Sequence, residues 1–285
     1  MSQTPAAASG SVLTSSPARL PDLKIVPSAA LLLHEECDPD RVERLTARLG
    51  AEGVLRNPPI AAALDGGAYV VLDGANRVTA LQRAGMPDQL VQVVDYDDPA
   101  LVLEVWAHLL VDDGPLAARV TAAPAWQAVS PEAMRAGLED GTFACGIVTD
   151  VSARGMRTGG GLAERVGALA GVVTSYKGTT PIYRVQPASL DTLARQFGQT
   201  AALVLFPRLS KPDIRAIARL LVKLPTGISR HVVPLRALRV NVPLDLLRVA
   251  GPVAAKQARL DELIRARLLE HRVRHYPEPT VLYDE

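Results

Sequence analysis

A strand that runs directly into a helix through a glycine constrains this chain more than any other feature. Residues 70–72 are apolar, Gly74 interrupts the extended run, and a helical spacing of apolar residues begins at once. Such a junction leaves backbone N–H groups unpaired at the positive end of the helix, where a phosphate is favoured. Asp73, Asn76 and Arg77 add a carboxylate, an amide and a guanidinium. A plain surface turn would explain the same residues, so the junction alone does not establish a site.

Composition excludes several classes of protein. The chain has 285 residues, of which 48% are hydrophobic and 21% charged, which is typical of a globular protein of one large domain or two smaller ones. A net charge of +1 argues against a broad nucleic-acid surface, although it allows a local basic patch. No apolar run approaches the ~20 residues of a membrane span, so no membrane contact is expected. Two cysteines give no disulfide framework, and we expect a cytoplasmic protein.

Apolar spacing and capping residues predict alternating strands and helices in the first part of the chain. Asp38 followed by Pro39 predicts the start of a helix, and Gly53 its end. A second helix should follow Asp97–Pro99, because apolar residues recur at helical spacing up to Leu109. The expected strands are 23–33 (with a turn), 59–64 and 69–72 as a hairpin, and 90–94.

A polar turn at residues 111–115 predicts a domain boundary. The expected organisation is a disordered tail (1–22), a first domain (23–113) and a second, mixed α/β domain (114–285). In the second domain we expect helices from 131, at 162–176, at 190–197 and from 211, a basic helix at 259–274, and strands at 143–149, 182–185, 201–206, 231–233 and 280–283. The basic helix is most simply a solvated face, because acidic residues are interspersed in it.

A second polar cluster surrounds a glycine near the end of the chain. Thr226, Ser229, Arg230 and His231 lie within six positions of one another, next to Gly227. An arginine binds a carboxylate or phosphate through two hydrogen bonds, and hydroxyls complete such a shell. A turn before a strand would account for the same residues.

Residues 23–111 resemble the ParB/sulfiredoxin superfamily, whose signature is a strand leading into a glycine-containing box that ends in Arg and grips nucleotide phosphates. Within this region the motifs are similar to those of free L-serine kinases, among them a kinase of the staphyloferrin B siderophore pathway. The similarity continues along most of the chain. The motifs are His34-Glu35, Asp73-Gly74-x-x-Arg77, Trp106-x-His108, Val173-x-Ser175-Tyr176-x-Gly178, Pro225-x-Gly227-x-x-Arg230 and Val242-Pro243-Leu244. The family usually has His where this chain has Asn76.

The resemblance implies roles for the residues in these motifs. Glu35 would be the catalytic base, and Asp73 would assist catalysis by holding Mg²⁺ or the serine hydroxyl. Nucleotide phosphates would be held by Gly74, Ala75, Asn76 and Arg77, with Thr79 on the same helix. The amino-acid pocket would be formed by Trp106, His108, Thr226, Ser229, Arg230 and His231, with Arg230 as the carboxylate anchor.

The resemblance therefore implies an α/β (α+β) protein with a ParB/sulfiredoxin-like N-terminal domain and a second domain that closes a cleft. Its activity would be the phosphorylation of free L-serine to O-phospho-L-serine, with ATP or ADP and Mg²⁺. The product could feed 2,3-diaminopropionate synthesis for a siderophore, and a homodimer is possible. Two alternatives stay open at this point: a ParB-like DNA-binding regulator, and a nucleotide hydrolase or a kinase for another small hydroxylated acceptor. We expect weak or no nucleic-acid binding.

Overall fold

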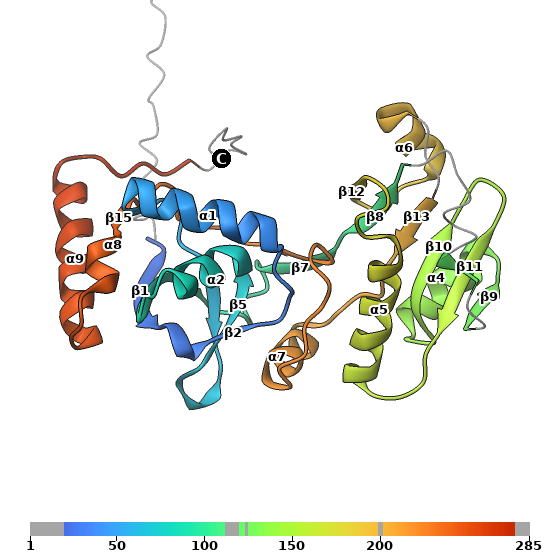
Figure 1. Cartoon of the computed structure of the whole chain (residues 1–285), viewed down its shortest axis with the longest axis horizontal. Helices are drawn as coiled ribbons and strands as arrows, with labels where there is room; N and C mark the ends of the chain where they lie inside the picture. Colours follow the sequence, from blue (N-terminus) through green and yellow to red (C-terminus); the bar gives the residue numbers. More distant parts are fainter. Residues whose placement is uncertain (1–19, 112–119, 123–124, 199–201, 277–285) are drawn as a thin grey trace, which may run out of the picture.

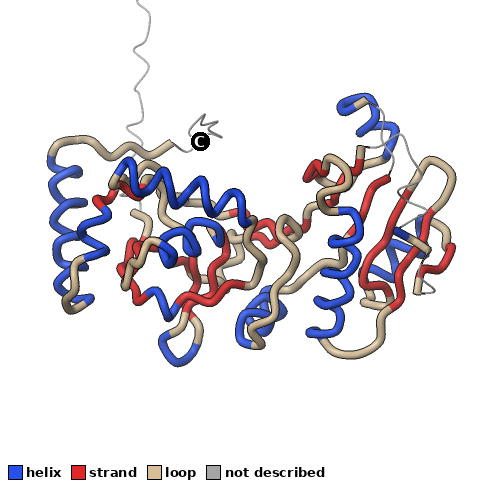
Figure 2. The backbone as a smooth tube through the Cα atoms, in the orientation of Figure 1, coloured by secondary structure: helices blue, strands red, loops and turns tan. Residues whose placement is uncertain are grey.

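The computed structural model of this chain describes residues 20–111, 120–122, 125–198 and 202–276. Within these ranges the chain forms two lobes, each built on a β-sheet, side by side along the long axis of the molecule (Figure 1). The mixed α/β class is confirmed, as the alternation of helix and strand along the tube in Figure 2 makes plain. Most of the predicted tail, the predicted strand 280–283 and the predicted boundary between residues 113 and 114 lie outside the described ranges.

The first lobe is a five-stranded sheet in the order β1-β6-β4-β5-β2. Pairing is antiparallel between β1 and β6 and between β4 and β5, and parallel between β4 and β6 and between β2 and β5. Side chains alternate between the two faces of this sheet, so Val71 packs with Val78 of α2, and Val70 and Leu72 pack on the opposite side. The elements are β1 (Asp22–Pro27), β2 (Leu31–Leu33), α1 (Pro39–Glu52), β4 (Ile60–Ala63), β5 (Tyr69–Asp73), α2 (Ala75–Arg83) and β6 (Asp88–Val94), with 3-10 turns at Ser28–Ala30 and Asp65–Gly67.

The caps of these helices follow the predicted chemistry. The Asp38 side chain accepts a hydrogen bond from the backbone N–H of Arg41 (3.0 Å) and so caps α1, and Gly53 ends that helix in the left-handed conformation (φ 64°). The predicted hairpin and the helix after Gly74 also form where the sequence places them.

The end of the described chain returns to the first lobe. The two-residue strand β15 (Val242–Pro243) pairs with β3 (Val54–Leu55), and it leads into α8 (Leu244–Arg248) and α9 (Val253–Leu269). Leu244, Leu247 and Leu260 share one apolar core with α1 and α2, and Figure 1 shows α8 and α9 in red beside the blue elements. The first lobe is therefore made from two separate stretches of the chain.

The second lobe is a six-stranded antiparallel sheet in the order β12-β8-β13-β10-β11-β9. Apolar side chains of α5 cover one face, while those of α4 and α6 pack on the other. The elements are β8 (Ala107–Leu110), β9 (Trp126–Ala128), α4 (Pro131–Glu139), β10 (Phe143–Val148), β11 (Ala153–Arg157), α5 (Leu162–Tyr176), β12 (Ile182–Val185), α6 (Leu190–Phe197) and β13 (Ala202–Leu205).

Two crossings join the lobes. Strand β7 (Val102–Val105) pairs with β14 (Ser229–Val232), so the outgoing and the returning chain run antiparallel to each other. Helix α7 (Lys211–Arg219) precedes the returning strand, and its Ile214 and Ile217 lie in one continuous core with Leu72 of the first sheet and Tyr176 of α5. This shared core holds the lobes together around the space between them.

The prediction of a helix after Asp97–Pro99 is wrong. The chain there forms two short strands, β7 and β8, on either side of Trp106. Val102 and Val105 are β-branched, and partner strands from distant parts of the sequence satisfy their backbone groups. Tertiary pairing therefore overrides the apparent helical spacing. The structure also adds β9 and β11, which no motif indicated.

Candidate functional site

A polar cavity of about 590 Å³ lies between the lobes. Its walls come from the loop after β2, the junction between β5 and α2, and the segment that leads into β14. Most residues singled out from the sequence line it: Glu35, Asp73, Gly74, Ala75, Asn76, Arg77, Trp106, Thr226, Ser229, Arg230 and His231. Two clusters far apart in the sequence are thus walls of a single cavity.

The start of α2 forms one end of the cavity. Gly74 has a left-handed backbone (φ 96°), and a Cβ there would lie 3.0 Å from Pro59 Cβ, so glycine is required on both counts. No described side chain caps this helix, which leaves its first N–H groups directed at the cavity. The Asn76 side chain accepts a hydrogen bond from the backbone N–H of Asp38 (2.9 Å) and ties the starts of α1 and α2 together. The arrangement suits an anion such as a phosphate.

Asp73 stands beside this junction between two arginines. Arg77 donates to Asp73 Oδ2 (2.8 Å) and to the carbonyl of Asn57 (3.0 Å), and Arg236 also pairs with Asp73 Oδ2. Burial acts to raise the pKa of Asp73, but the two guanidinium groups outweigh it and hold that pKa below its ordinary value. Asp73 is therefore a carboxylate at neutral pH.

Glu35 lies on the loop after β2 and points into the same cavity. Its backbone pairs with Leu224, and its carboxylate accepts hydrogen bonds from the backbone N–H of Gly227 and the hydroxyl of Ser229 (3.0 Å). Burial raises the pKa of Glu35 above its ordinary value, although these two donors act in the opposite direction. A carboxylate with a raised pKa in a cavity is a candidate proton acceptor.

His34 contacts Ser229, the hydroxyl next to Glu35. Its Nδ1 donates to the carbonyl of Val71 (2.7 Å), and burial lowers its pKa to about 4, so the ring is neutral at pH 7 and its Nε2 is an acceptor. The Ser229 hydroxyl lies 2.8 Å from that Nε2 and 3.0 Å from Glu35 Oε2. A hydroxyl has one proton, so Ser229 can donate to only one of these two acceptors at a time. Which acceptor receives the proton depends on the protonation state of Glu35.

Arg230 is already engaged by two groups of the protein. Its Nη1 forms an ion pair with Glu104 (2.9 Å) across β14 and β7, and its guanidinium carbon lies 4.5 Å from the centre of the Trp106 ring. His231 stacks edge-on against His34 with ring centres 5.5 Å apart, and its Nε2 lies 2.8 Å from the hydroxyl of Tyr96.

Two predicted site residues lie outside the cavity lining. His108 is 2% exposed; it accepts a hydrogen bond from Tyr176 at Nδ1 (2.8 Å) and donates from Nε2 to the carbonyl of Gly227 (3.2 Å). It supports the Gly227 turn from behind because its strand position turns it into the core. Thr79 lies on the second turn of α2, with its hydroxyl 3.0 Å from the Cys37 sulfur.

Several lining residues were absent from the predicted site. The most notable are Arg184 on β12 and Arg236 after β14, which lie in stretches without a recognisable motif. Arg41 and Asn57 also line the cavity. Only the folded chain brings these residues together, so sequence spacing carried no signal for them.

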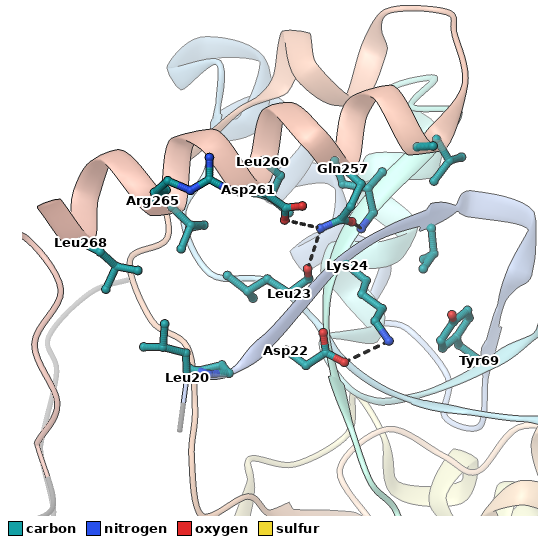
Figure 3. A pocket seen from close by; sticks show the side chains of 16 residues that line it. Leu20, Asp22, Leu23, Lys24, Tyr69, Gln257, Leu260, Asp261, Arg265 and Leu268 are labelled. Carbon is teal, nitrogen blue, oxygen red and sulfur yellow. Dashed lines mark hydrogen bonds and ion pairs between the residues drawn. The ribbon is translucent and has the colours of Figure 1, made fainter. Parts of the chain in front are cut away.

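A second hollow of about 730 Å³ lies between β1 and α9, far from these groups. Figure 3 shows that Leu23, Leu260 and Leu268 face it, while the amide of Gln257 bonds to the carbonyl of Leu23 (3.1 Å) and to Asp261 (2.9 Å). Most of its lining side chains are apolar, and its two carboxylates, Asp22 and Asp261, are already paired with Lys24 and Gln257. The polar cavity contains most of the residues that the motifs indicated, so it is the candidate active site.

Comparison with known proteins gives a consistent picture. No family model matches the chain. The chain is 24% identical over 229 residues, or 79% of its length and 84% of the relative, to the ATP-dependent L-serine kinase SbnI of Staphylococcus aureus. It is 32% identical over 82 residues to an ATP-dependent L-serine kinase of Staphylothermus marinus, which is 28% of this chain and 32% of that protein.

Solved structures agree with the sequence relatives. C-terminally truncated SbnI from Staphylococcus aureus superposes with a TM-score of 0.70 at 21% identity, covering 86% of this chain and 97% of the other. Free serine kinase in complex with AMP gives a TM-score of 0.68 at 17% identity, covering 81% and 95%. A variant of free serine kinase in complex with ADP gives the same TM-score, 0.68, at 16% identity, covering 81% and 96%. The chain therefore shares the fold of the free serine kinases, and the resemblance to that family indicated by its motifs is confirmed.

Proposed function

We propose that this protein phosphorylates free L-serine to O-phospho-L-serine with a nucleotide donor. One observation carries the proposal: Glu35 lies in the same cavity as the uncapped start of α2. A phosphoryl donor held at the helix start and an acceptor hydroxyl beside the carboxylate would meet between them. Transfer needs an in-line acceptor, neutralised phosphate charge and a group that takes the hydroxyl proton.

The chain's own residues would divide this work. Gly74, Ala75 and Asn76 would present backbone and amide N–H groups to the phosphates, and Arg77 would add a charge-assisted contact. Glu35 would accept the hydroxyl proton. Trp106 would form a wall of the amino-acid pocket, with Thr226 and His231 nearby.

The residues present fit a magnesium ion carried in with the nucleotide. Asp73 is an ionised carboxylate at the edge of the phosphate position, and Mg²⁺ is usually held by one or two carboxylates together with substrate phosphates and water. Among the described residues, no group of three or more His, Cys, Asp or Glu side chains is placed to hold a metal ion. A magnesium ion carried in with the nucleotide would neutralise phosphate charge.

The relatives named as ATP-dependent kinases favour ATP as the donor. A variant of free serine kinase was solved in complex with ADP, so ADP is tested as a second donor. The test is incubation with Mg-ATP or Mg-ADP and a panel of L-serine, L-threonine, L-homoserine and D-serine, with phosphorylated products resolved by mass spectrometry. We expect O-phospho-L-serine as the main product. Nucleotide hydrolysis without a phosphorylated amino acid would instead favour a hydrolase.

Three further expectations concern where the protein acts, whether it forms a homodimer and which pathway it supplies. No helix in the described part combines the length and apolar character of a membrane span. Both cysteines are free thiols, which suits the reducing cytoplasm. The predicted homodimer and the link to a siderophore or diaminopropionate pathway stay predictions; size-exclusion chromatography with light scattering tests the first of them.

A further inference from the structure

Arg184 is a cation of the cavity that no motif indicated. It lies on β12 of the second lobe, and its guanidinium covers the Gly227 turn so closely that a Cβ at residue 227 would overlap it. Gly227 also has a left-handed backbone (φ 86°), which favours glycine there, and any side chain at residue 227 would displace the Arg184 guanidinium. The absence of a side chain at residue 227 thus lets an arginine approach the backbone of this turn, whose N–H holds Glu35.

The charges of the cavity set Arg184 apart from the other arginines. Arg77 and Arg236 are paired with Asp73, and Arg230 is paired with Glu104. Among the described residues, no carboxylate forms an ion pair with Arg184; its side-chain contact is a long 3.5 Å hydrogen bond to the Thr226 hydroxyl. Its charge is nonetheless close enough to Glu35 to act on that carboxylate. A guanidinium of this kind can accept a carboxylate from a ligand.

Arg184 lies next to the residue that holds Glu35, which suits a substrate as small as serine. The acceptor hydroxyl must lie within hydrogen-bond reach of Glu35, and the carboxylate of the same amino acid is only a few bonds away. Gly227 donates to Glu35 on one side and lies under Arg184 on the other, so Arg184 is one residue's breadth from the base. The phosphate end of the cavity, at Gly74, belongs to the opposite lobe.

We propose that Arg184, rather than Arg230, binds the carboxylate of the amino-acid substrate and so determines that free serine is accepted. This inference rests on the proposed kinase function. Arg230 then has a structural role: it packs on the Trp106 ring and, through its ion pair with Glu104, stabilises the pairing of β14 with β7. Thr226 steers the Arg184 guanidinium towards the cavity.

The test compares L-serine with L-serinamide, in which a neutral amide replaces the carboxylate. Wild type, Arg184→Gln, Arg184→Lys and Arg230→Lys are assayed with both acceptors and with varied Mg-ATP. Arg184→Gln should lower kcat/KM for L-serine about 10- to 100-fold, as expected for loss of a hydrogen bond to a charged group, and should leave L-serinamide within about threefold. Arg184→Lys, which keeps the charge without the planar fork, should fall between. Arg230→Lys should keep the preference for serine over serinamide.

Each outcome decides between the two arginines or against the function. The inference is overturned if Arg184→Gln keeps the serine preference, if it raises the KM for ATP more than that for serine, or if Arg230→Lys alone removes the preference. A wild-type protein that phosphorylates neither acceptor with either nucleotide overturns the proposed function, and this inference with it. Arg184 is exposed, so the variants should fold, and thermal melting confirms that they do.

Discussion

The carboxylate of Glu35 accepts a hydrogen bond from the backbone N–H of Gly227, a residue 192 positions further along the chain. This contact joins the loop after β2 to the segment that crosses between the lobes, and a backbone bridge between Glu35 and Leu224 reinforces it. The proposed base is therefore held by the same segment that would form the amino-acid side of the cavity. If the proposal holds, binding of an acceptor and orientation of Glu35 are linked.

Glu35→Gln should reduce phosphoryl transfer by at least about 100-fold, because the amide keeps the shape of the side chain and cannot accept the hydroxyl proton. Nucleotide affinity, measured by calorimetry, should change little. Glu36→Gln is a matched control, since Glu36 lines the same cavity at the next position. If Glu36→Gln is the inactive variant and Glu35→Gln turns over normally, the base is Glu36.

The pH dependence of kcat/KM should show an acidic limb above the ordinary range of a glutamate. Burial raises the pKa of Glu35, and only the carboxylate form accepts a proton, so activity falls as the pH drops through that raised pKa. Ser229→Ala removes a hydrogen bond that lowers this pKa, and the limb should therefore move to higher pH. A limb that stays in place in Ser229→Ala would separate Ser229 from the titration of the base.

The sequence predicted the parts of this site whose signals are local. Gly74 and Arg77 follow their strand within five positions, and Asp38 caps its helix through a contact to a residue three positions later. The fold around these residues therefore followed from short-range rules. The helices expected from residues 131, 190 and 211 also begin where the sequence placed them, each capped by the side chain of the preceding serine (Ser130, Ser189 and Ser210).

The remainder of the site depends on long-range pairing that no local pattern encodes. Arg184 enters the cavity because β12 pairs with β8, and the segment 102–110 is extended because distant strands supply its hydrogen bonds. The return of residues 240–264 to the first lobe is another example, since its apolar spacing does not say which core it joins. A polar turn near residue 113 likewise carried no information about a chain that crosses between the lobes twice.

Arg77→Ala should weaken nucleotide binding about 10- to 100-fold, because a charge-assisted contact to phosphate is lost. The substitution also removes a hydrogen bond to Asp73 and one to the carbonyl of Asn57, so the junction loses support as well. Arg83→Ala is the matched control, since Arg83 is exposed at the end of the same helix and removes the same charge. Equal ADP affinity of the two variants in calorimetry would make the junction a plain turn.

Any binding to DNA should be weak, independent of sequence and steeply dependent on salt. The basic side chains of α9 are interspersed with Asp261 and Glu262, and Arg267 donates to the carbonyl of Asn241 (3.1 Å), so little unpaired positive charge faces solvent together. Fluorescence anisotropy with several duplexes at 50 and 200 mM salt measures this. A tight and sequence-selective complex at the higher salt would favour the DNA-binding regulator.

Gly227→Ala should reduce both stability and activity. Residue 227 has a left-handed backbone (φ 86°), and the Arg184 guanidinium occupies the space that a side chain there would need. The backbone strain alone costs about 1–2 kcal/mol in the free energy of unfolding. Gly66→Ala is a control for that strain, since Gly66 has a similar φ (78°) in an exposed turn with open space around it. Gly66→Ala should lose comparable stability in urea unfolding and keep its activity. Gly227→Ala should in addition lose kcat/KM for L-serine, because displacement of Arg184 and of the N–H that holds Glu35 disturbs the carboxylate anchor and the base together. Equal activity in the two variants would show that the turn bears on folding alone.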